Sequence, residues 1–218
     1  MVAGPTTLLA RLQGTVQALH DVELDLDVHA YLVDDATRRE IPGAREHLPE
    51  QLFVREEEGN VEIALYISPN VMARLEQDNP HTRLHAGNLE HYCIALEGVS
   101  HFVFLTWRAS MGWPVSALEM EIQAEVDKFI AVWLLLADQG APRPQTAGGL
   151  AKQLFDSYVL RDELSPEEAE RYHTATRVAK QFCAQLARRY AKDETPQRIL
   201  KDAHSFYRKG LAHKLRAA

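Results

Sequence analysis

The sequence predicts an α+β protein in which an antiparallel four-stranded sheet is covered by helices and followed by a helical C-terminal segment. Apolar residues alternate after residue 21, as in a strand, and two further apolar runs flank a Gly-Asn pair, as in a hairpin. From residue 150 onward the apolar spacing is helical. The four expected strands are Leu24–Val33, Leu52–Glu57, Val61–Ile67 and Val99–Trp107.

The composition is that of a globular chain, and one stretch divides it into two parts. Of its 218 residues, 46% are hydrophobic and 25% are charged, so the chain can bury a core. Prolines and glycines in residues 139–149 are typical of an interdomain linker. We therefore expect an α+β domain over residues 1–138 and a helical C-terminal region over residues 150–218.

The first three expected strands follow an N-terminal helix. The first strand is indicated by alternate apolar residues that share one face of an extended chain: Val22, Leu24, Leu26 and Val28. The next two strands form a hairpin with its turn at Gly59-Asn60. This turn pairs Val54 with Leu65 and Leu52 with Ile67.

The fourth expected strand follows a short helix. Asn88 is a good N-cap for a helix from Leu89 to Glu97, and Gly98 is a good residue to end it. The β-branched and aromatic residues that come next favour a buried strand over Val99–Trp107.

Helix-start signals define the remaining elements. Ser116 and Glu119 form a predicted capping box that opens a helix from Ala117 to Ala137, which we expect to cover the sheet. Ser165-Pro166 with Glu168 opens a second long helix, and Thr195-Pro196 opens a third. The second helix carries an apolar stripe at heptad-like spacing: Tyr172, Ala175, Ala179, Phe182 and Leu186.

Glu97, His101 and Glu125 form the candidate functional site. On an extended chain His101 shares the core-facing side with Val99, and Glu97 approaches from that side. Glu125 can lean into the core from its helix. A buried histidine beside carboxylates breaks local rules in the way that functional sites do, so the three could bind a divalent metal or do acid and base chemistry. The alternative is a hydrogen-bonded cluster that only joins helix to sheet.

Two other groups of residues offer weaker candidates. Asp25, Asp27 and His29 on the first strand could chelate a hard cation, although an acidic strand face more often protects a sheet edge. Residues 186–218 hold nine Lys and Arg against three Asp and Glu, a net +6, while the 15 basic and 28 acidic residues before them give −13. This basic tail could bind a polyanion, or it could dock on the acidic body of its own chain or of a second copy.

The charge balance and the missing motifs narrow the function. An acidic chain with a sequence pI near 5.8 disfavours nucleic-acid binding. No nucleotide-binding loop, hydrolase nucleophile elbow or HExxH zinc motif is found. Neither a signal peptide nor a membrane segment is recognised, and the two cysteines lack disulfide-type spacing, so we expect a cytoplasmic protein without a membrane partner.

We therefore expect a non-catalytic interaction or accessory protein that acts through its helical region and self-associates or binds another protein. The apolar stripe from Tyr172 to Leu186 motivates this expectation. One alternative is a metal-dependent, hydrolase-like enzyme that uses Glu97, His101 and Glu125. A second alternative is a protein that binds nucleic acid or another polyanion through the basic C-terminal helices. No cofactor is expected, apart from the divalent metal that the glutamate and histidine cluster could hold.

Overall fold

The computed structural model describes residues 7–156, 164–190 and 196–216, and most of these residues are helical. The elements are α1 (Leu8–His20), the 3₁₀ helix η1 (Val28–Tyr31), α2 (Asp35–Glu40), β1 (Glu50–Glu57), β2 (Asn60–Ile67), α3 (Pro69–Gln77), α4 (Ala86–Ser110), α5 (Ala117–Asp138), α6 (Arg143–Ala151), the π-helix η2 (Lys152–Asp156), α7 (Pro166–Tyr190), α8 (Pro196–Tyr207) and α9 (Leu211–Arg216). Within these ranges the sheet has two strands. The predicted four-stranded sheet is therefore wrong.

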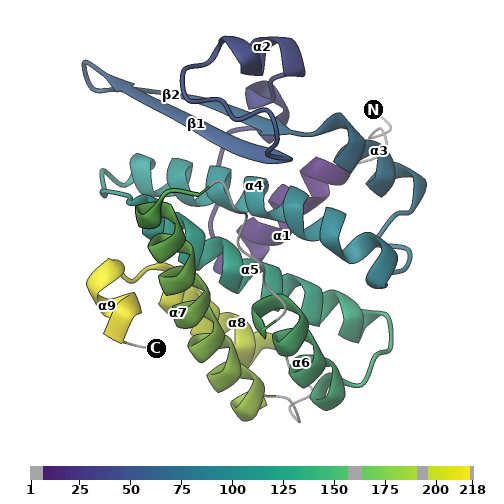
Figure 1. Ribbon diagram of the computed structural model, residues 1–218. Coiled ribbons are helices and arrows are strands. Elements are labelled where there is room, and N and C mark those ends of the chain that lie inside the picture. The colour runs from purple at the N-terminus through teal and green to yellow at the C-terminus, as the bar shows by residue number, and fades with distance from the viewer. Residues whose placement is uncertain (1–6, 157–163, 191–195, 217–218) are drawn as a thin grey trace.

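Helix α4 is where the sequence prediction fails most clearly. It runs without a break from Ala86 to Ser110, so the predicted strand Val99–Trp107 is its second half and Gly98 does not end a helix. Every residue from Gly98 to Arg108 is buried. The second half of α4 is buried all round because it lies between the β-hairpin and α5 (Figure 1), and a short, mostly apolar run of this kind does not distinguish a strand from a helix. The helix also starts earlier than predicted, with His85 as N-cap and Asn88 as its capping-box partner.

The predicted strand Leu24–Val33 is also wrong. Residues 28–31 form η1, and an isolated bridge from Leu32 to Leu65 is the one strand-like contact found for this segment. The Gln13 side chain explains the difference, because it donates to the Leu26 carbonyl and accepts from the Val28 amide. Backbone groups that a strand would pair with another strand are thus satisfied by a side chain.

The hairpin is confirmed, but its register differs from the predicted one by two residues. Leu52 pairs with Leu65 and Val54 with Ile63. The turn residues are Glu58 and Gly59, which both have positive φ, of 51° and 80°. A two-residue turn with both φ values positive matches the twist of the strands, and it places the turn one residue earlier than Gly59-Asn60.

The predicted helix starts at Ser116 and Ser165 are confirmed. The capping box of Ser116 and Glu119 opens α5, and Ser165 and Glu168 exchange the equivalent two bonds at the start of α7.

Helix α6 begins within the stretch that was predicted as a linker. One apolar core includes residues from α1 through α8, and α7 packs along α5 (Figure 1). Whether the two halves also fold separately stays a prediction.

Candidate functional site

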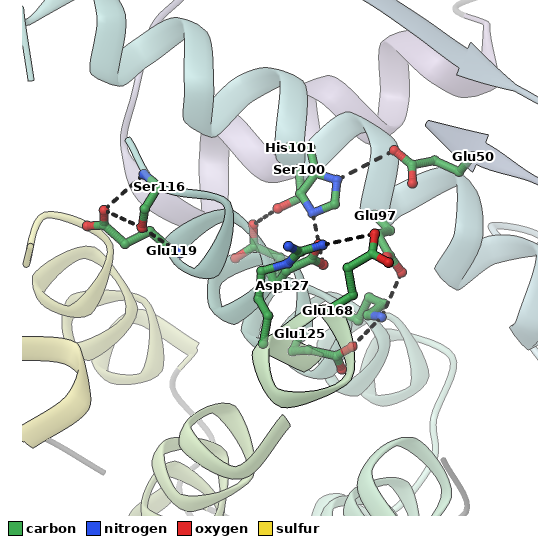
Figure 2. Close-up of polar contacts among 12 residues, drawn as sticks. Glu50, Glu97, Ser100, His101, Ser116, Glu119, Glu125, Asp127 and Glu168 are labelled. Atoms are coloured by element: carbon green, nitrogen blue, oxygen red, sulfur yellow. Dashed lines mark hydrogen bonds and ion pairs between the residues drawn. The ribbon is translucent and has the colours of Figure 1, made fainter. Parts of the chain in front are cut away.

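Charged side chains from three elements meet beside the contact of α4 with α5. Helix α4 contributes Glu97 and His101, which are one turn apart and therefore on the same face. Helix α5 contributes Glu121, Glu125 and Lys128, and the first residue of β1 contributes Glu50. Figure 2 shows Glu50 and Glu97 on two sides of His101. We call these six residues the His101 cluster.

The imidazole of His101 lies between two carboxylates. Its Nδ1 is 3.5 Å from Glu50 Oε1, and its Nε2 is 3.6 Å from Glu121 Oε2. Both distances exceed a good hydrogen bond, and the buried Nε2 has no hydrogen-bond partner. Burial alone would disfavour the imidazolium, but the two neighbouring carboxylates, Glu121 and Glu50, outweigh it and raise the pKa of His101 well above its usual value.

Lys128 holds two further carboxylates of the His101 cluster. Its Nζ donates to Glu97 Oε2 and to Glu125 Oε1, each at 2.8 Å. Burial disfavours the ammonium, yet the charges of Glu125 and Glu97 raise the pKa of Lys128 well above its ordinary value. Burial raises the pKa of Glu125, and Lys128 partly opposes that shift. The lysine therefore fixes the side chain of Glu97 while remaining charged.

Three residues of the His101 cluster form a group that could hold a metal ion. Ligand atoms of Glu97, His101 and Glu121 all lie within 4.8 Å of one another. The sequence predicted Glu97 and His101 with Glu125. The structure places Glu125 beside the group, bonded to Lys128, and Glu121 takes the third position. Glu121 lies one turn before Glu125 on α5, and its approach to His101 depends on how α5 packs against α4.

Glu50 reaches His101 because Gly98 has no side chain. A Cβ at Gly98 would lie 2.8 Å from Glu50 Cγ and 3.1 Å from Glu50 Oε1. Burial raises the pKa of Glu50, and the neighbouring His101 opposes the shift. Sequence reasoning missed both residues, since Glu50 is distant in the chain and Gly98 was taken for a helix end. A glycine inside a long buried helix was the available signal for a close contact.

Arginines form the solvent side of the site. The Arg171 guanidinium lies 3.9 Å from Glu121 Oε1 and 3.9 Å from Glu168 Oε1. Arg45 also donates to Glu168. The side chain of His101 is 9% exposed, whereas those of Glu97 and Arg171 are 25% and 27% exposed. The site is therefore deepest at His101 and opens towards Glu97 and Arg171.

A second polar network lies on the other flank of the α4–α5 contact. Asp127 accepts hydrogen bonds from His20 Nε2 and Ser100 Oγ, each at 2.6 Å, and from Gln123 Nε2 at 2.7 Å. Lys214 on α9 donates to Gln123 Oε1 at 2.7 Å. All five residues are fully buried, and we call them the Asp127 network. Figure 2 shows Ser100 and His101, neighbours in the chain, directed to different partners.

The other sequence candidates occupy places that differ from those expected. Asp27 accepts a hydrogen bond from His29 and caps η1. Hydrogen bonds from the His29 backbone and side chain lower the pKa of this exposed carboxyl group. In the basic tail, Lys214 is buried in the Asp127 network, and Arg208 donates to the backbone oxygens of His20 and Asp21. These two residues dock on their own chain.

The apolar stripe of α7 is covered within the chain. Ala175, Ala179, Phe182 and Leu186 are buried where α7 packs on α5 and α8. The face that motivated self-association is thus occupied.

Comparisons with known proteins do not extend this description. No helix among residues 7–156, 164–190 and 196–216 is long and apolar enough to cross a membrane. No protein-family model matches the chain, and no curated protein or solved structure matches it significantly. The function has to be inferred from the side chains themselves.

Proposed function

We propose that this protein binds one divalent transition-metal ion through Glu97, His101 and Glu121, and that the ion supports a chemical reaction at the site. The observation that carries the proposal is the buried Nε2 of His101. It has no hydrogen-bond partner and faces Glu121 Oε2 at 3.6 Å, inside a group of three potential ligands. Buried polar atoms without hydrogen-bond partners are rare in folded proteins, and a bound ion would give this nitrogen a partner.

The separations of the ligand atoms are close to those of a metal centre. Carboxylate oxygens and imidazole nitrogens bind Zn²⁺ at about 2.0–2.2 Å with tetrahedral geometry, so two ligands of one ion are about 3.5 Å apart. The three atoms here lie within 4.8 Å of one another. Side-chain movements of about 1 Å would therefore bring all three to ligand separations.

The charge of the surroundings also favours a cation. The site and its arginines contain two more carboxylates than permanent cations, counting Glu50, Glu97, Glu121, Glu125 and Glu168 against Arg45, Lys128 and Arg171. An excess of negative charge is costly when it is buried. Burial also raises the pKa values of Glu50 and Glu125. A divalent ion that replaces the His101 proton would neutralise the excess.

The type of ligand restricts the ion and the role. Imidazole with carboxylates suits Mn²⁺, Fe²⁺, Co²⁺ or Zn²⁺ better than Ca²⁺, which prefers oxygen ligands alone. Three protein ligands leave positions for water or substrate, as in catalytic rather than structural zinc sites. Lys128 and Arg171 contact Glu97 and Glu121 from outside, in the way that outer hydrogen bonds orient metal ligands elsewhere.

The interaction role expected from the sequence is the second candidate. The apolar stripe of α7 no longer supports it, because that stripe packs inside the chain. Two of the basic residues expected to bind a polyanion, Lys214 and Arg208, instead bond Gln123 and the His20 carbonyl of their own chain. Both roles stay predictions that a sedimentation measurement and a salt-dependent binding assay would test.

Titration of metal-free protein with Co²⁺ tests the proposal, since the visible absorption of Co²⁺ reports its ligands. We expect saturation at one ion per chain and a rise in melting temperature, because a ligand bound to the native state stabilises it. His101→Gln should weaken binding about 100-fold or more. His91→Gln, a change to another histidine of α4, should leave it unaltered. Equal Co²⁺ affinity in wild type and His101→Gln would refute the proposal, as would an absence of saturable binding.

A further inference from the structure

Arg171 has donor capacity beside the proposed metal ligands. Its Nε is buried and makes no hydrogen bond. The two carboxylate oxygens with which it forms ion pairs, on Glu121 and Glu168, are each 3.9 Å away, beyond hydrogen-bond distance. The ring of Tyr172 lies against the same guanidinium, with its centroid 5.4 Å from Cζ. Since a guanidinium carries five N–H donors in a planar fork, it can bind a further oxyanion.

Glu168 cannot satisfy the unused N–H donors of Arg171, because both of its oxygens already accept other hydrogen bonds. One of its oxygens, Oε1, accepts a hydrogen bond from Arg45. The other, Oε2, accepts from the Ser165 amide at 3.0 Å and closes the capping box of α7. Displacing Glu168 towards Arg171 would break the capping box of α7 and destabilise the start of that helix. Arg171 is therefore held near two carboxylates without being satisfied by either.

The position of Arg171 links it to the proposed metal ion. Glu121 directs Oε2 to His101 and Oε1 to Arg171, so a single carboxylate separates the guanidinium from the ligand group. Arg171 and Glu97 are also more exposed than His101, at 27%, 25% and 9% of their side chains. A molecule arriving from solvent would meet Arg171 and Glu97 before reaching the ion.

We infer that the metal site takes a small molecule that carries an oxyanion, a carboxylate or a phosphate group, held jointly by the ion and by Arg171. The inference rests on the proposed metal site, because without the ion the excess of carboxylates would repel an anion. With the ion bound, an oxyanion oxygen fills an open position and Arg171 binds a second oxygen of the same group. Arg171 then selects for the substrate's anionic group and orients it.

The test is a two-step titration of the full chain. Wild-type protein is first loaded with Co²⁺, and acetate or inorganic phosphate is then added while the Co²⁺ absorption is recorded. We expect a saturable spectral change with at least one of the two anions. Arg171→Gln should weaken anion binding about tenfold or more but change Co²⁺ affinity far less, since a charge-assisted contact to the anion is lost and no metal ligand is. Arg177→Gln, at an exposed arginine of the same helix, is the matched control.

Each outcome bears on a different statement. If both anions fail to alter the spectrum of the Co²⁺-loaded protein, the inference is wrong and the metal site stands. If wild type and Arg171→Gln bind the anion equally well, the ion alone binds it, and the role of Arg171 is wrong. Absence of Co²⁺ binding would remove both the metal site and the inference. Arg171→Lys guards against misfolding of the glutamine variant, because it keeps the charge and should retain part of the anion affinity.

Discussion

The Asp127 network and the His101 cluster, on either side of the α4–α5 contact, differ in the lengths of their polar contacts. In the Asp127 network the carboxylate receives three hydrogen bonds of 2.6 to 2.7 Å, and its members are fully buried. In the His101 cluster Lys128 makes two bonds of 2.8 Å, but the imidazole makes two contacts of 3.5 and 3.6 Å. The neighbouring Arg171 makes two contacts of 3.9 Å. Although Ser100 and His101 are adjacent on α4, Ser100 belongs to the Asp127 network and His101 to the His101 cluster.

This is the difference that we expect between a structural polar group and a binding site. A buried carboxylate with three short bonds is at its preferred geometry and gains nothing from a further partner. A histidine that faces carboxylates at more than 3.4 Å is held in place without being satisfied. The Asp127 network should therefore control stability, and the His101 cluster should control binding.

The largest expected effect comes from breaking the Asp127 network. Asp127→Asn replaces an oxygen that accepts hydrogen bonds with an amide that donates, and it leaves buried donors without an acceptor. Removing one partner of a buried charged group typically costs about 3–5 kcal/mol. Urea unfolding of the metal-free protein measures this loss. Glu121→Gln in the His101 cluster should cost less than half as much. Similar losses in the two variants would contradict the distinction.

The next effect is a dependence of stability on pH that originates at Lys214. Burial lowers the pKa of Lys214 to about 7, from its ordinary value of 10.5, although Asp127 and Glu119 oppose the shift. Between these values the unfolded chain binds more protons than the native state, so the free energy of unfolding should rise with pH from 7 towards 10. The full rise corresponds to a few kcal/mol, at about 1.4 kcal/mol per pH unit of pKa shift.

Lys214→Met isolates this contribution from that of the other titrating groups. Methionine has a similar length and no charge, so the stability of the variant relative to wild type should be highest at pH 7 and should fall as the pH rises. The measurement is urea unfolding of both proteins at pH 7, 8 and 9. A constant difference between them would show that Lys214 does not titrate in this range.

A third effect distinguishes the ligand set that the structure indicates from the one predicted by sequence. Glu121→Gln should lower Co²⁺ affinity about 100-fold, since it removes a ligand, or about 2.7 kcal/mol. Glu125→Gln removes a carboxylate that bonds Lys128 and should lower the affinity tenfold at most. Calorimetric titration of the two variants measures both. The reverse order would restore Glu125 as the third ligand.

The sequence located the centre of the site but not its surroundings. His101 was expected to face the core beside Glu97 on the basis of strand parity, and it is buried, although the residues lie on a helix. Residues four apart share a helix face, so the pairing holds for a different physical reason. Glu50 and Glu121 could not be found from local pattern, because their approach depends on the hairpin and on the packing angle of α5. The capping boxes of α5 and α7 were predictable because they are local.

Gly98→Ala has the smallest expected effect and shows how the hairpin supports the His101 cluster. Alanine would favour an interior helix position by up to about 1 kcal/mol. Here its Cβ would lie 2.8 Å from Glu50 Cγ and 3.1 Å from a Leu65 methyl group, and overpacking of this kind costs about 1–3 kcal/mol. We expect a net loss of about 1 kcal/mol in urea unfolding. In a Glu50→Ala background the clash with Glu50 is absent, so the same substitution should be less destabilising or should stabilise the protein. Equal losses in both backgrounds would show that the Leu65 contact, rather than the approach of Glu50 to His101, requires a glycine at this position.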